Sequence, residues 1–115
     1  MKVDFAGELP AIEKVLKRLE QLVAAEITSE ALVDDEGFFG VELDCEAVGG
    51  GLALLPDTDS LGYLSYTGIS TYNLYLMNAL AVVLLELGGR YEHASSLPAA
   101  AKQPWQLARQ WYQRI

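Results

Sequence analysis

The chain of 115 residues contains one cysteine, Cys45, and one histidine, His93, so nucleophilic catalysis has few candidates. A cysteine nucleophile needs a neighbouring base. Cys45 falls on the apolar side of an alternating segment, where a free thiol is typical of core packing. A serine nucleophile would need His93 beside it, and no Gly-x-Ser-x-Gly turn exists to present one. We therefore expect neither kind of nucleophile, although the count of residues allows a Cys45–His93 pair.

Three carboxylates, Glu42, Asp44 and Glu46, alternate with apolar residues along one segment. On a strand, residues two apart share a face and lie about 6.5 Å from each other, which overlaps the separation of acid and base in glycosidases. Acid–base catalysis would need one carboxyl group withdrawn from water and the other ionised. The clean alternation instead predicts that all three face solvent. We favour a solvated acidic face and keep a small enzyme that uses these carboxylates as an alternative.

Two acidic turns could offer oxygen ligands to a hard cation, one over residues 34–36 and one over residues 57–59. Neither matches a calcium-binding loop, and aspartate is favoured in turns for backbone reasons alone. One histidine and one cysteine are too few for zinc. The glycines at 49–51 precede an apolar strand rather than a helix and have no basic neighbour, so they predict a turn and not a phosphate site. We expect no metal and no cofactor.

The charge is distributed unevenly along the chain. The net charge is −8, yet residues 20–89 contain twelve acidic residues and no lysine or arginine, while residues 1–19 carry +1 and residues 90–115 carry +3. A nucleic-acid-binding protein needs basic residues to neutralise phosphates, so we exclude that class. An acidic surface favours solubility, and it also steers and docks a basic protein partner.

The hydrophobic pattern predicts an α+β fold in a single domain over residues 1–115. The elements that we expect are an N-terminal amphipathic helix, an antiparallel β-meander of three to four strands, a buried hydrophobic helix and a C-terminal helix. Their ranges are 8–26 for the first helix, 27–33, 39–47, 52–55 and 61–66 for the strands, 70 or 71 to 87 for the buried helix, 90–93 for a short last strand and 104–115 for the final helix.

Neither a membrane span nor a secretory signal is expected. The longest apolar stretch, residues 72–87, is shorter than the roughly twenty residues needed to cross a bilayer. The first ten residues contain Asp4 and Glu8 and lack an apolar segment, so they do not resemble a signal peptide. A single cysteine forms no internal disulfide, which agrees with a reducing compartment. We therefore expect a cytoplasmic protein.

A candidate binding surface combines the acids with an aromatic residue. Strict alternation places Phe38 on the same strand face as the three carboxylates, and aromatic side chains are frequent anchors in protein interfaces. An acidic hairpin turn lies just before this strand. The candidate partner-binding residues are therefore Asp34, Asp35, Glu36, Phe38, Glu42, Asp44 and Glu46.

These observations predict a non-enzymatic, acidic protein-binding module that occludes a basic partner. The most concrete form is an immunity protein or antitoxin that neutralises a bacterial toxin by direct binding, as a monomer or weak dimer. A secretion chaperone for an effector protein is an alternative. Such chaperones are similarly small and acidic and begin with a helix and a meander. They are usually dimers and tend to have two strands after the middle helix, whereas residues 90–93 offer at most one here.

Overall fold

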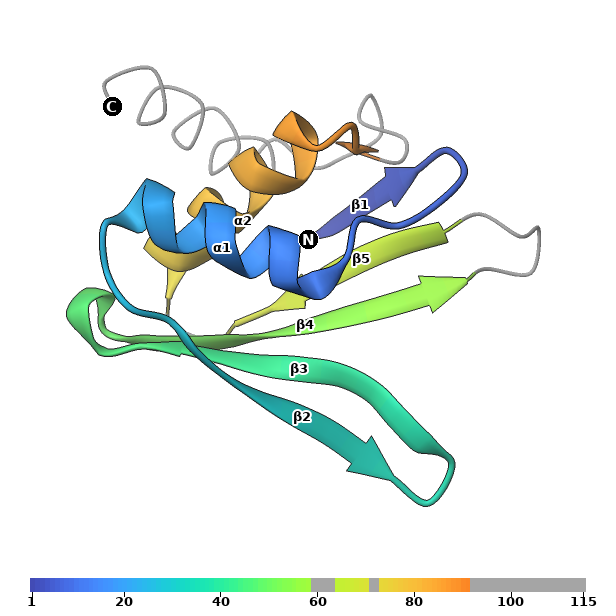
Figure 1. Ribbon diagram of the computed structural model, residues 1–115, viewed down its shortest axis with the longest axis horizontal. Coiled ribbons are helices and arrows are strands. Elements are labelled where there is room, and N and C mark those ends of the chain that lie inside the picture. Colours follow the sequence, from blue (N-terminus) through green and yellow to red (C-terminus); the bar gives the residue numbers. More distant parts are fainter. Residues whose placement is uncertain (59–63, 71–72, 92–115) are drawn as a thin grey trace.

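The computed structural model describes residues 1–58, 64–70 and 73–91 of the chain. In these ranges one antiparallel sheet has the strand order β2-β3-β4-β5-β1-β6, and α1 and α2 lie side by side on one of its faces (Figure 1). The predicted α+β class is confirmed. The elements are β1 (Lys2–Phe5), α1 (Ile12–Val23), β2 (Thr28–Asp34), β3 (Gly37–Cys45), the 3-10 helix η1 (Glu46–Val48), β4 (Gly50–Thr58), β5 (Leu64–Ile69), α2 (Leu74–Glu86) and β6 (Arg90–Tyr91).

The predicted meander is present as β2 to β5, and the sheet extends further than expected. The additional strand is β1, which pairs with β5 through Val3 opposite Tyr66 and with β6 through Val3 opposite Tyr91. In β1 the side chains of Val3 and Phe5 are buried and the other two are only partly covered. Four residues give too short an alternation to predict a strand, so β1 depends on its two partners.

Helix α1 packs its apolar side into the core. Val15, Leu19 and Leu22 are buried along this helix, which agrees with the predicted amphipathic pattern. The helix begins at Ile12 and not at residue 8, so Pro10 lies before it and not in its first turn. The carbonyl oxygen of Pro10 accepts a hydrogen bond from the Tyr66 hydroxyl, which fixes the start of α1 to β5.

Helix α2 is buried along most of its length, as its continuous apolar sequence predicts. Its N-terminal cap is Asn73 and not Ser70 or Thr71. Asn73 Oδ1 accepts the Leu76 N–H at 2.9 Å, and Thr71 lies outside the described residues. The helix ends as predicted at glycine. Gly88 adopts φ +102°, a conformation that residues with a side chain disfavour. The backbone N–H groups of Gly88 and Gly89 donate hydrogen bonds to carbonyl oxygens in the last turn of α2.

The core lies between the inner face of the sheet, meaning the face that the helices cover, and the helices themselves. Along β3 the side chains of Val41, Leu43 and Cys45 are buried, while those of Glu42 and Asp44 face outward, as the alternation predicts. In the ranges that the structure describes, no helix combines the length and apolar composition needed to cross a bilayer. The helix predicted from residue 104 lies outside the described residues.

Candidate functional site

Two of the three predicted carboxylates lie on the outer face of β3. Glu42 and Asp44 are exposed there, on the side of the sheet away from the helices. Glu42 is directly opposite Glu30 of the neighbouring strand β2. We call Glu30, Glu42 and Asp44 the acidic face. Like charges placed directly opposite on adjacent strands destabilise a sheet, so the fold maintains this face against its own electrostatic repulsion.

Within the described residues, no ion pair reaches the acidic face. An ion pair joins Arg18 of α1 to Glu86 of α2, with Nε and Oε1 2.9 Å apart, and lies on the helix side of the molecule. The absence of basic residues from 20 to 89 explains this arrangement, because none of the strands that flank β3 carries a cation. The carboxylates therefore present uncompensated negative charge to any protein that approaches.

Glu46 does not continue the strand as predicted. Strand β3 ends at Cys45, and Glu46 begins η1, where the chain turns toward β4. Alternation in the sequence could not reveal this end of the strand, because the end is set by the pairing of β3 with β4, which stops at Cys45 opposite Gly50. Glu46 nevertheless stays close to Asp44 and is joined by Glu26, which the sequence did not single out. Together they surround an open acidic hollow of about 390 Å³, lined by Glu26, Thr28, Asp44, Glu46 and Ala47.

The acidic turn over residues 34–36 connects β2 to β3, as predicted. Asp34 Oδ1 accepts the Glu36 N–H at 2.8 Å, an arrangement that stabilises turns through a side chain. Gly37 follows with φ +111° and begins β3. All three acidic side chains of the turn are exposed. The turn therefore displays three negative charges at the closed end of the β2–β3 hairpin.

Phe38 lies on the inner side of this hairpin and not with the acidic face, so the prediction of a shared face is wrong. The register pairs Leu32 with Gly40 but Val33 with Phe38, which leaves Phe39 without a cross-strand partner. Such an extra residue is a β-bulge. Because paired residues share a face, Phe38 lies on the face of Val33. The bulge reverses the alternation that the sequence was expected to follow.

Three large apolar side chains are exposed beside the acidic turn. Val33 is 65% exposed, Phe38 55% and Phe39 43%, and we call them the apolar tip. The closed end of the hairpin extends away from both helices (Figure 1), so α1 covers the central strands and not this end. Clusters of exposed apolar side chains are uncommon on soluble proteins and mark contact surfaces. Phe39 was missed because alternation assigned it to the core.

The other candidate chemistry is not assembled in the described part of the chain. Cys45 is fully buried. The pKa of Tyr75 is raised, mainly by burial and to a smaller extent by its electrostatic interaction with Cys45. His93 lies outside the described residues, so a pair with Cys45 is not tested. Among the described residues, no group of three or more histidine, cysteine, aspartate or glutamate side chains could hold a metal ion.

Comparisons with protein-family models, curated proteins and solved structures return no match. The candidate site therefore consists of three features of the β2–β3 hairpin and its surroundings: the apolar tip, the acidic turn and the acidic face. All three are exposed, and two carry the same charge. This combination offers apolar contact and attraction to cations.

Proposed function

We propose that this protein is a non-enzymatic binding module for a basic protein partner, which it contacts through the β2–β3 hairpin. The observation that carries the proposal is the exposed apolar tip beside the acidic turn. Aromatic side chains such as Phe38 and Phe39 supply contact area at the centre of interfaces, and charged residues at the rim add selectivity. The three acids of the turn favour a basic partner over a neutral one.

The acidic face supports the same kind of partner. Glu30 and Glu42 repel each other across β2 and β3, and lysine or arginine side chains from a partner would relieve that repulsion. Electrostatic attraction of this kind accelerates association, and it weakens as salt screens the charges. A basic partner would therefore both reach this surface faster and stabilise the strands that carry it.

The concrete form that we propose is an immunity protein or antitoxin that binds and occludes a bacterial toxin in the cytoplasm. Such a role needs a rigid surface and no reacting groups. The apolar tip lies on a hairpin whose strands pair on both sides of the bulge at Phe39, so the hairpin that carries the tip is formed before binding. A preformed surface loses little conformational entropy on association.

The experiment compares partner capture by matched variants. Immobilised wild-type protein is exposed to a lysate of the source organism beside Phe38→Ser, which removes an apolar side chain from the tip. The control is Leu74→Ser on α2, because Leu74 is exposed to a similar degree, 65% against 55%, and lies outside the hairpin. We expect wild type and the control to retain the same basic protein. Phe38→Ser should bind it roughly 10-fold to 30-fold more weakly.

Retention of the same proteins by Phe38→Ser and wild type would contradict the proposal. A captured partner with a net negative charge would contradict it as well. Retention of several unrelated, mostly apolar clients together with a stable dimer of this chain would favour the secretion-chaperone alternative instead.

A further inference from the structure

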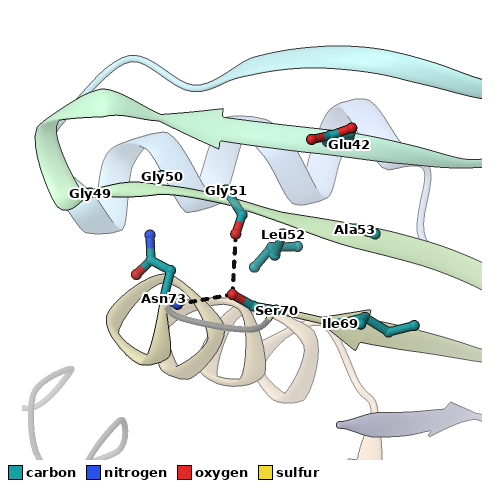
Figure 2. A pocket seen from close by; sticks show the side chains of 9 residues that line it. All are labelled: Glu42, Gly49, Gly50, Gly51, Leu52, Ala53, Ile69, Ser70 and Asn73. Atoms are coloured by element: carbon teal, nitrogen blue, oxygen red, sulfur yellow. Dashed lines mark hydrogen bonds between the residues drawn. The ribbon is translucent and has the colours of Figure 1, made fainter.

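A second hollow, of about 390 Å³, lies on the outer face of the sheet and ends at the start of α2 (Figure 2). Its floor is the outer side of β4, its sides come from β3 and β5, and its closed end is formed by the β3–β4 turn together with Ser70 and Asn73. The lining residues are Glu42, Gly49, Gly50, Gly51, Leu52, Ala53, Ile69, Ser70 and Asn73.

Small residues on β4 keep the floor of this hollow low. Ala53 lies between Glu42 on β3 and Ile69 on β5 in one cross-strand row. Next along the floor is Gly51, where a Cβ atom would lie 2.2 Å from the carbonyl oxygen of Leu43. Close pairing of β3 with β4 therefore demands glycine at this position. The same requirement leaves the space above it open.

Asn73 closes the end of the hollow with a hydrogen-bond donor that is not used. Asn73 is only 7% exposed, and its Nδ2 has no hydrogen-bond partner in the described part of the chain. Its other polar groups are occupied, because Oδ1 caps Leu76 and the backbone N–H donates to Ser70 Oγ at 3.0 Å. Figure 2 shows the nitrogen end of this side chain directed toward the Gly49–Gly50 turn, away from the helix.

The polar groups around the hollow define the ligand that it fits. A buried donor without a partner is rare in native proteins, and here it offers two N–H groups to an acceptor such as a carbonyl oxygen. Glu42 places a carboxylate on the side wall, and no lining residue is basic. The carboxylate disfavours an anion at this helix N-terminus. The ligand therefore needs a cation for Glu42 and an acceptor for Asn73.

We propose that the hollow receives one arginine residue of the basic partner, an inference that rests on the proposed function. The guanidinium group pairs with the Glu42 carboxylate, which can accept two parallel hydrogen bonds from it. The main-chain carbonyl of the same segment accepts from Asn73 Nδ2. The aliphatic stem lies over Ala53 and beside Ile69. The volume is at the lower end of the range for ligand pockets, which suits one long side chain.

The test is an NMR titration of the isotope-labelled full chain with Nα-acetyl-arginine methylamide. We expect saturable shifts of the Asn73 side-chain amide and of the backbone amides at 49–51, with a dissociation constant of about 1–10 mM. The matching citrulline derivative has the same shape without the charge. It should bind at least about tenfold more weakly, since it forms no ion pair with Glu42.

Three variants separate the two contacts. Glu42→Gln removes the carboxylate and should weaken arginine binding about tenfold, whereas Glu36→Gln removes an equal charge at the hairpin turn and should leave it unchanged. Asn73→Ser keeps a residue that caps helices well and should weaken binding about fivefold. The backbone amide spectrum of α2 reports whether Asn73→Ser is folded. If this variant does not fold, arginine binding by Glu42→Gln decides the proposal.

The proposal is overturned if the citrulline derivative produces the same shifts, if Glu42→Gln binds as wild type does, or if the hollow shows no saturable shift. These outcomes are distinct from failure of the proposed function. If partner capture depends on Phe38 but arginine does not bind in the hollow, only the arginine site is refuted. Arginine binding in the hollow without capture of any basic protein would refute the proposed partner alone.

Discussion

Replacing Asn73 by serine should stabilise the protein, which is unusual for a change at a buried residue. Asn73 Nδ2 is buried without a partner in the described part of the chain, and such a donor costs about 1–3 kcal/mol. Serine caps a helix about as well as asparagine, so the bond to the Leu76 N–H is retained in kind. The smaller side chain leaves a void that costs about 1 kcal/mol. The expected net gain is therefore about 1 kcal/mol.

Urea denaturation followed by circular dichroism measures this change, and Asn73→Ala provides its control. Alanine also removes the unpaired amide but loses the cap, so it should be about 1 kcal/mol less stable than serine. In thermal unfolding, the midpoint temperature of Asn73→Ser should be roughly 4 °C higher than that of wild type. If Asn73→Ser is instead less stable than wild type by 1 kcal/mol or more, then Asn73 Nδ2 has a hydrogen-bond partner in solution. Its proposed role as an unpaired donor that is free to bind a ligand is then refuted.

Three further predictions concern the sheet and its contacts. Glu30→Lys replaces repulsion of Glu42 by attraction and should raise the free energy of unfolding by about 0.5 kcal/mol at low salt; a gain that persists unchanged in 1 M salt, where the charges are screened, would contradict this origin. Gly51→Ala forces a Cβ to within 2.2 Å of the Leu43 carbonyl oxygen and should cost about 2 kcal/mol in urea denaturation. Burial, followed by the charge of Glu13, raises the pKa of Tyr66 above 10.0. Its neutral form is therefore favoured in the folded state, this contribution is complete below pH 10.0, and stability falls as pH rises through the higher folded pKa. Tyr66→Phe should be about 1 kcal/mol less stable at neutral pH because the Pro10 carbonyl loses its donor, and its alkaline loss should be shallower.

The sequence predicted those parts of the fold that depend on local pattern. The alternation of Val41 and Leu43 with Glu42 and Asp44 is regular, so β3 and its outward carboxylates could be inferred directly. The continuous apolar stretch that ends at Gly88 likewise indicated α2 and its termination. In both segments, the type of each residue is enough to predict whether its side chain is buried.

Features that depend on a partner strand could not be predicted. Strand β1 has four residues and is defined by pairing with β5 and β6. The face of Phe38 depends on a bulge that appears only in the register against β2. Glu46 leaves the strand because η1 begins there.

The hollow at the start of α2 could not be predicted from the sequence either. It combines Glu42, Ala53 and Asn73, which lie on three elements and meet only in the folded sheet. Ser70 and Thr71 were the expected caps because serine and threonine are common at that position. In the structure Ser70 binds the backbone of Asn73 and the carbonyl of Gly51, so Asn73 caps the helix instead.

The most direct test of binding through the acidic hairpin is the association rate of the captured partner as a function of salt. For wild type, the rate should fall at least about tenfold between 50 mM and 500 mM salt while the dissociation rate changes little. Phe38→Ser should keep the same salt dependence and dissociate about tenfold faster or more, because the apolar contact is lost after docking. An association rate that is independent of salt, or a dissociation rate that is unaffected by Phe38→Ser, would contradict recognition of a basic partner through this hairpin.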